Sequence, residues 1–189
     1  MKIENPMHTN HNNHGAPFAL DIKSIRTNAR KHVDEGAQTA SYRGNVDEII
    51  HLLNHSLATE LVCVLRYKRH YFTASGIHAQ SIANEFNIHA QEELAHADLI
   101  AERIVQLGGE PDFSPDTLTK RSHADYAPCL SLEEMIKENL VAERIAIDAY
   151  RALIRHIGDD DPTTKRILES ILAQEEEHAD ELADWIKTT

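Results

Sequence analysis

Four long stretches of the chain place apolar residues every three or four positions, which is the spacing of one face of an α-helix. They run from residue 45 to about 76, from about 78 to 107, from 131 to about 158, and from 161 to 186. Helices of this length are more than twice the usual mean and need neighbours to bury their apolar faces. The pattern therefore predicts an all-α fold in which four long helices pack as a bundle.

Start signals support these boundaries. Asn45 and Ser131 are good N-caps, and each is followed three residues later by a Glu that completes a capping box. Asp161-Pro162 supplies an N-cap and a proline at the first helical position. The connection 108–130 is long enough to run from one end of the bundle to the other. We therefore expect a crossover that makes the third helix parallel to the second.

The pattern weakens before residue 45. Residues 1–17 are rich in Asn and His and predict a flexible polar tail. Residues 20–35 have a short amphipathic pattern that ends at a glycine, which predicts an accessory helix outside the bundle. We expect an N-terminal extension, 1–44, and a bundle domain, 45–189. The tail histidines, which would hold a metal ion only loosely, are His8, His11 and His14.

Each of the four long helices carries a Glu in the middle of its apolar stripe, and the chain repeats one unit twice. A Glu is followed seven residues later by a Tyr, and the next helix carries Glu-x-x-His. The first copy consists of Glu60, Tyr67, Glu93 and His96, and the second of Glu143, Tyr150, Glu175 and His178. A Glu and a His three residues apart share one helix face. A buried carboxylate must be paired or bind a metal, because burying it alone is costly.

Four Glu and two His spread over four helices match a known template, the carboxylate-bridged pair of metal ions in a bundle core, and so resemble the ferritin-like four-helix bundle. Glu60 and Glu143 are then terminal ligands, Glu93 and Glu175 bridge, and His96 and His178 each bind one ion. We predict the same six residues to be the catalytic ones. Buried Glu–His pairs without metal would leave uncompensated charge in an apolar core.

Carboxylates with one imidazole per ion suit iron or manganese better than metals that prefer soft ligands, and zinc is a further substitute. Tyr67 and Tyr150 are placed to donate hydrogen bonds behind the ligands, or equally to fill the core. His89 lies on the inward face without an assigned role as a ligand. Cys63, about one turn from Glu60, is interpreted as a small core residue.

Composition narrows the classes of function. The chain has 189 residues, a net charge of -12 and two cysteines, Cys63 and Cys129. We expect one soluble, cytoplasmic domain without a membrane partner, since no apolar run is long enough to span a bilayer and no signal core is present. Two cysteines form neither a disulfide framework nor a Cys-based metal site. The acidic excess argues against a main nucleic-acid role and favours attraction of cations such as Fe²⁺.

Motifs on all four helices resemble those of bacterioferritin. They are Leu53-Asn54-x-x-Leu57-x-x-Glu60-Leu61-x5-Tyr67, Glu93-x-x-His96-Ala97-Asp98, Glu102-Arg103-Ile104, Glu143-Arg144-x5-Tyr150-Arg151 and Glu175-x-x-His178. The resemblance covers residues 45–186. It implies a hollow shell of identical subunits, each of which oxidises Fe(II) with O2 or H2O2 at a pair of iron ions and delivers ferric mineral to the interior.

Two departures change what this resemblance implies. Bacterioferritins place a haem-ligating Met directly after the bridging Glu of the second helix, where this chain has Leu94, so we expect no haem. Bacterioferritins and ferritins also have a fifth helix, which lines the fourfold axes of 24-subunit cages, whereas only three residues follow Ile186. The combination resembles the Dps branch and implies a shell of twelve. Segment 18–36 would then pack on the outside of the shell or between subunits, and would bury Leu20, Ile22 and Ile25 there.

Two other functions stay open. One is a peroxide-removing enzyme similar to rubrerythrin or manganese catalase, although rubrerythrins usually add an iron domain held by four cysteines. The other is DNA protection of the Dps type. Residues 1–45 hold six Lys or Arg against four Asp or Glu, a basic excess too slight to make DNA the expected partner. The sequence leaves the preferred oxidant and the native metal undecided.

Overall fold

The computed structural model describes residues 18–77 and 79–188, so the histidines of the tail lie outside the described residues. All regular structure in these ranges is helical. The elements are α1 (Ile22–Asn28), the 3-10 turn η1 (Val33–Glu35), α2 (Val46–Thr73), α3 (Ala79–Gln106), α4 (Leu118–Arg121), α5 (Leu132–Ile157) and α6 (Pro162–Thr188). The four predicted long helices are therefore present, with ends within a few residues of those expected.

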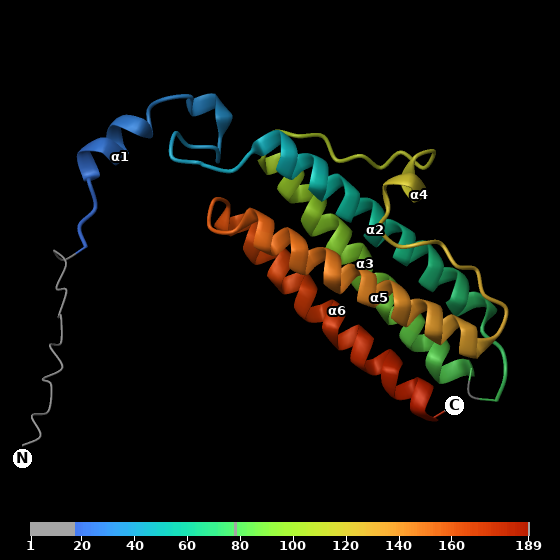
Figure 1. Cartoon of the computed structure of the whole chain (residues 1–189). Coiled ribbons are helices and arrows are strands. Elements are labelled where there is room, and N and C mark those ends of the chain that lie inside the picture. The colour runs from blue at the N-terminus through green and yellow to red at the C-terminus, as the bar shows by residue number, and fades with distance from the viewer. Residues whose placement is uncertain (1–17, 78, 189) are drawn as a thin grey trace, which may run out of the picture.

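Helices α2, α3, α5 and α6 lie side by side as an elongated bundle (Figure 1). The closest packing joins α2 to α3 and α5 to α6, and these two hairpins meet through α2 with α5 and α3 with α6. The chain then crosses the length of the bundle between α3 and α5, so these two helices run in the same direction (Figure 1). The predicted four-helix bundle, with a long crossover between its second and third helices, is confirmed.

The crossover is tied to α2 by polar contacts. Asn54 accepts a hydrogen bond from the backbone N–H of Asp112 at 2.7 Å and donates one to the carbonyl of Glu110 at 3.2 Å. Arg121 in α4 donates to the carbonyl of Asn54 at 3.1 Å, and His55 Nδ1 lies 2.9 Å from the carbonyl of Arg121. These contacts satisfy backbone groups of a long irregular segment and fix its path along the bundle.

The helix caps follow the sequence signals. Asn45 accepts from the backbone N–H of Glu48, and Ser131 forms the full reciprocal capping box with Glu134. The box predicted at Asn45 is closed differently, because the Glu48 carboxylate accepts from the Asn45 side-chain amide at 3.2 Å. Helix α5 ends at Gly158, whose φ of 55° lies in the left-handed region that glycine tolerates best.

One buried carboxylate joins three parts of the chain at the start of α6. Asp161 is 1% exposed and caps the helix by accepting from the backbone N–H of Thr164 at 2.9 Å. Both of its oxygens accept from Arg103 Nη2 of α3 at 2.9 Å, and one accepts from the Tyr42 hydroxyl at 2.7 Å. The Asp161 carboxylate therefore has a partner on every side, as a buried charge requires.

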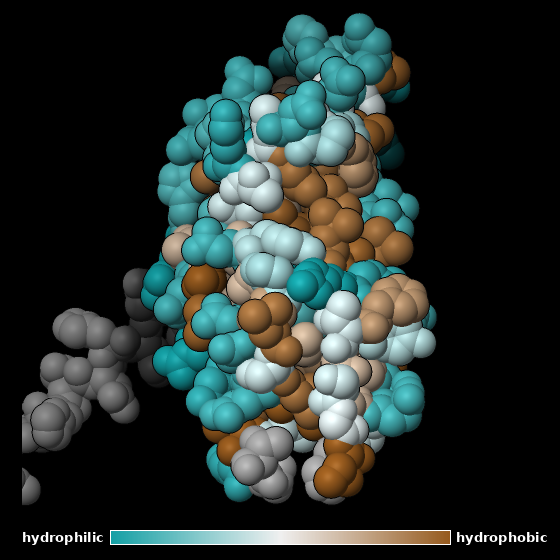
Figure 2. All heavy atoms as spheres, turned by 90° about the vertical axis from the view of Figure 1, so that its right-hand side faces the viewer, coloured by the Kyte–Doolittle hydropathy of each residue, from teal (hydrophilic) through white to brown (hydrophobic). Residues whose placement is uncertain are grey.

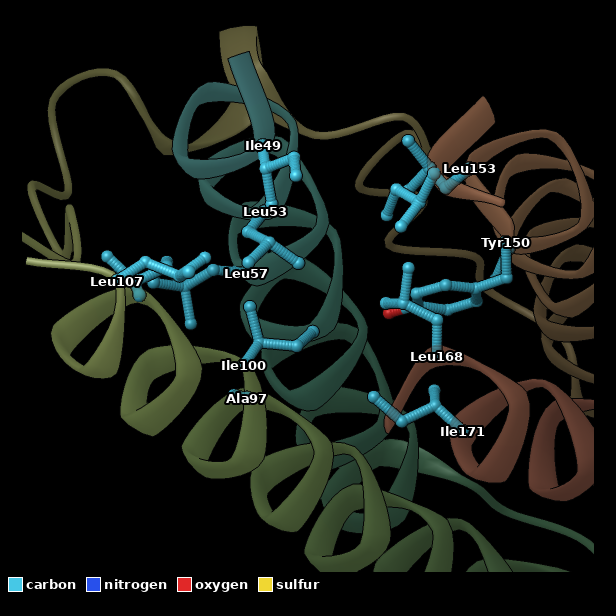
Figure 3. Packing of buried hydrophobic residues seen from close by; sticks show 13 residues of the cluster. Ile49, Leu53, Leu57, Ala97, Ile100, Leu107, Tyr150, Leu153, Leu168 and Ile171 are labelled. Carbon is cyan, nitrogen blue, oxygen red and sulfur yellow. The ribbon is translucent and has the colours of Figure 1, made fainter. Parts of the chain in front are cut away.

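Most of the apolar core lies in two clusters at opposite ends of the bundle, and a third, smaller one joins α2 to α4 through Ala58, Val62 and Leu118. Figure 3 shows side chains of the first cluster, from α2, α3, α5 and α6, pointing toward the bundle axis. Along α2 the first cluster ends at Leu57 and the second begins at Cys63; along α3 the second ends at Ala90 and the first begins at Ala97. The same change of cluster occurs on α5 and α6. All six predicted ligands fall within these changes, at the middle of the bundle.

The N-terminal segment differs from its prediction. Instead of one helix over residues 20–35, α1 begins after its N-cap Asp21 and ends at Asn28. His32 has a φ of 49°, a left-handed conformation that no α-helix can contain, and only η1 follows it. Helix α1 lies outside the bundle as expected (Figure 1). Leu20, Ile22 and Ile25 are exposed in the single chain, so their burial against other subunits stays a prediction, as does the domain boundary at 44.

One expectation about membranes needs correction. By length and composition alone, α2 is apolar enough to cross a membrane. Half of its most apolar window is buried inside the bundle, and the same helix carries the buried Glu60 and Arg66. A core helix meets the same criteria because it is covered on most sides by other helices. We therefore interpret α2 as one of the four helices that form the core of the bundle.

Candidate metal centre

The six predicted ligand residues lie together in the middle of the bundle, and none is more than 2% exposed. They form two groups, within each of which one ligand atom per residue lies within 4.8 Å of all the others. The first group is Glu60, Glu93, His96 and Glu175, and the second is Glu93, Glu143, Glu175 and His178. Glu93 and Glu175 belong to both groups, which is the geometry required of bridging carboxylates.

Both imidazoles turn their Nδ1 atoms toward the carboxylates. His96 Nδ1 lies 3.4 Å from Glu60, 3.3 Å from Glu93 and 3.1 Å from Glu175. His178 Nδ1 lies 3.7 Å from Glu93, 4.0 Å from Glu143 and 3.9 Å from Glu175. Each ring therefore offers one nitrogen to the centre and keeps the other for a partner outside it.

The two tyrosines donate hydrogen bonds to the terminal carboxylates, and each does so across the bundle. The Tyr67 hydroxyl of α2 donates to Glu143 of α5, and the Tyr150 hydroxyl of α5 donates to Glu60 of α2. Both rings are also fully buried, so they fill the core as well. The two copies of the repeated unit thus exchange partners, and neither copy completes its own ligand shell.

The Nε2 atoms of the two histidines have partners that sequence reasoning missed. His96 Nε2 lies 2.9 Å from Gln174 Oε1, and His178 Nε2 lies 2.9 Å from Glu92 Oε2. Gln174 and Glu92 each directly precede the Glu of a Glu-x-x-His motif. The signal in the sequence was this shared position, but its meaning depends on how the two hairpins face each other.

The residues present fit a pair of divalent metal ions. Five carboxylate oxygens of the four Glu residues and Nδ1 of His178 are buried without a hydrogen-bond partner. Unpaired buried carboxylates are unstable, whereas two dications would balance the charge of four carboxylates. An oxygen-rich set with one imidazole per ion suits iron or manganese.

Without metal, protons hold this cluster together. Burial and the neighbouring Glu93 charge raise the pKa of Glu60 to about 8. Burial by itself lowers the pKa of His178, but the nearby carboxylates of Glu93 and Glu143 raise that pKa to about 9. Burial also opposes ionisation of Glu93, yet the nearby His178 ring and a hydrogen bond from His96 hold the pKa of Glu93 below its ordinary value. A binding metal would replace these protons.

Comparison with known proteins identifies the family to which this bundle and its buried carboxylates belong. The profile of the ferritin-like domain matches residues 50–189. The chain belongs to the ferritin-like family. The resemblance deduced from the helix motifs is confirmed, since relatives and structural neighbours of this ferritin-like protein include bacterioferritins and Dps proteins.

Three similar proteins illustrate the relationship. A nutrient stress-induced DNA-binding protein of Nostoc sp. is 30% identical over 139 residues, which cover 71% of this chain and 74% of the relative. The bacterioferritin of Desulfovibrio desulfuricans is 25% identical over 132 residues, which cover 69% and 70% of the two chains. A solved structure of a dodecameric thioferritin, the bacterioferritin-related protein from Bacteroides fragilis, matches with a TM-score of 0.74 and 31% identity, covering 76% and 87%.

Three further residues discussed in the sequence analysis have defined positions in this ferritin-like protein. Cys63 is buried, burial raises the pKa of its thiol, and Arg66 donates to its sulfur at 3.5 Å. His89 is buried between the Tyr67 hydroxyl and Glu181. Leu94, which stands at the haem-ligand position of bacterioferritins, is 46% exposed on the outer face of α3.

Proposed function

We propose that this protein is an iron-storing ferroxidase that works in the cytoplasm. It binds two Fe(II) ions, its substrate, between Glu60, His96, Glu143 and His178, with Glu93 and Glu175 shared between the ions. The observation that carries this proposal is the pair of fully buried ligand groups with two common carboxylates. Membership of the ferritin-like family supports it.

The arrangement suits a two-electron oxidation. Each Fe(II) gives up one electron, and O2 takes the pair with two protons to form H2O2, or H2O2 takes the pair with two protons to form two water molecules. Two adjacent ions can supply both electrons at once. Four carboxylates favour the higher charge of the ferric product, since oxygen ligands prefer hard cations. Tyr67 and Tyr150 hold Glu143 and Glu60 in orientation through their hydrogen bonds.

Storage requires a closed shell, and we propose a shell of twelve identical subunits. The thioferritin of Bacteroides fragilis is described as dodecameric, which supports this assembly. A bundle alone has no interior for a mineral, whereas identical subunits related by point-group symmetry enclose one. Figure 2 shows apolar side chains running along one face of the bundle between hydrophilic ones, and apolar surface of this kind favours packing against other subunits.

The test is anaerobic titration of the metal-free protein with Fe(II), followed by O2 or H2O2 in separate experiments. We expect two Fe(II) per chain to be oxidised quickly by at least one oxidant, with mineral forming at higher loading. Glu175→Ala should slow this fast phase by more than the roughly 10–100-fold that loss of an outer partner costs. Glu177→Ala removes an exposed Glu two residues away and is the matched control. Unchanged oxidation by Glu175→Ala would refute the assignment.

DNA protection is a second candidate, supported by relatives named as DNA-binding and DNA-protecting proteins. The described chain has four basic side chains in or next to α1, all exposed: Lys23, Arg26, Arg30 and Lys31. The net charge of -12 opposes phosphate binding by the rest of the surface. A gel-shift assay at low salt should therefore show weak binding that is lost when these four residues are replaced by Gln. Binding that survives this replacement would exclude α1 as the contact.

A further inference from the structure

The two imidazoles of the centre differ in the group that stands behind them. His96 Nε2 faces the side-chain amide of Gln174 at 2.9 Å, and His178 Nε2 faces the carboxylate of Glu92, also at 2.9 Å. Both partners are only partly buried, and the Glu92 side chain is 35% exposed. One imidazole N–H therefore donates to a neutral oxygen and the other to a charged one.

Residues 92 and 174 occupy the same place in the two copies of the repeated unit. Each directly precedes a Glu-x-x-His motif, and each reaches across to the His of the other copy. At this pair of positions the two copies therefore differ by one chemical group, a carboxylate in place of an amide. A carboxylate that accepts from one imidazole nitrogen makes the opposite nitrogen a stronger donor to a metal, and it adds a negative charge nearby. An amide oxygen contributes much less of either effect.

A second pair of matched positions differs in the same sense. His89 stands four residues before Glu93, and the corresponding residue before Glu175 is Ile171. The His89 ring stacks on His178 with centroids 4.1 Å apart, and its Nε2 lies 2.9 Å from a second carboxylate, Glu181. Ile171 instead packs in the apolar cluster that contains Tyr150. The side chain that stacks on His178 is thus polar and paired with a carboxylate, whereas the residue at the matched position in the second copy is apolar.

We propose that the two metal positions are inequivalent, and that Glu92 makes the Glu143–His178 position the tighter one. The first divalent ion binds there, and the second binds at the Glu60–His96 position and exchanges more readily. Glu92 and Gln174 act as positioning residues that set the order of filling. This inference rests on the proposed function only in that the more readily exchanging ion would be the incoming Fe(II).

The experiment is a calorimetric titration of the metal-free full-length protein with Mn(II), which needs no oxidation. We expect two binding steps in the wild type. Glu92→Gln should weaken the tighter step by roughly 10–100-fold and make the two steps nearly equal. Gln174→Glu should instead tighten the weaker step. Crystals grown with one equivalent of Mn(II) should show it at Glu143–His178 by anomalous scattering, and at Glu60–His96 in the double exchange Glu92→Gln/Gln174→Glu.

Glu177→Gln is the matched control, since it removes one negative charge from an exposed position near Glu175. If Glu92→Gln and this control behave alike, or if wild-type crystals with one equivalent show equal occupancy, the inference is overturned while the metal centre stands. If the wild type binds no Mn(II), Fe(II) or Zn(II), the proposed function fails as well. The crystal result on the wild type decides the order of filling even if a variant folds poorly.

Discussion

At the scale of single residues, the centre shows how position sets the chemistry of one side-chain type. Glu93 and Glu60 are equally buried, yet the pKa of Glu93 is lowered and that of Glu60 is raised to about 8. The difference comes from their neighbours, because His96 and His178 both lie next to Glu93 and favour its charge, while the Glu93 charge opposes ionisation of Glu60. Glu60 therefore keeps its proton because its neighbour Glu93 stays ionised.

Metal binding should therefore depend on pH. Below about pH 8 to 9 the metal-free protein holds protons on Glu60 and His178, which a metal must displace. Affinity for Mn(II) should rise with pH through this range and go on rising above pH 9, because the pKa values of the ligands His96 and Glu175 are raised as well. Calorimetry from pH 6 to 9.5, in buffers of different ionisation enthalpy, measures affinity and released protons together. Affinity that does not change with pH would contradict this account of the metal-free cluster.

That the six proposed ligands face the bundle core could be predicted from the sequence because both requirements are local: a Glu on an apolar stripe, and a His three residues after it. The partners behind them were not predictable in this way. Tyr67 donates to Glu143, and Glu92 faces His178, only because the two hairpins pack at one particular offset. Helix periodicity gives the face of a residue but carries no information about the register between helices.

At the scale of elements, capping signals fixed three of the four long helices at their starts, whereas apolar periodicity alone overestimated α1. Its apolar residues, such as Ile22 and Ile25, lie on one face, but the residues that the structure describes leave both side chains exposed. A helix gains most of its stability from tertiary packing. Without a neighbouring helix among the described residues to cover its apolar face, α1 is therefore only seven residues long.

Loss of the cap at the start of α6 should cost more than a cap usually does. Asp161→Ala removes the acceptor for Thr164, Tyr42 and Arg103 together, and it leaves the buried Arg103 unpaired. We expect a loss of about 3–5 kcal/mol of unfolding free energy, the cost of breaking a buried ion pair on one side. Thermal unfolding followed by circular dichroism measures it.

Asp159→Ala is the control for this variant, since the Asp159 side chain is 93% exposed and forms a surface ion pair with Lys165. It should change the unfolding free energy by less than about 1 kcal/mol. Equal effects of the two substitutions would show that Asp161 acts as an ordinary helix cap.

At the scale of the whole molecule, the assembly is the quantity to measure first. Native mass spectrometry should give a particle of twelve times the chain mass of 21.3 kDa. Replacing Ile22 and Ile25 by Ser should weaken this particle if α1 packs between subunits, because both side chains are exposed in the single chain. A particle of 24 chains would overturn the predicted shell, and a stable dimer would remove the basis for storage.

The crossed hydrogen bonds between the two hairpins have a mechanical consequence. Helix packing is closest within each hairpin, α2 with α3 and α5 with α6, and the two hairpins meet across a seam that contains all four glutamates. Without metal, protons on these carboxylates and imidazoles hold the seam, whereas two bound metal ions would link its glutamates directly. Iron binding would therefore hold the two hairpins together more firmly. Amide exchange along the seam should slow as iron enters.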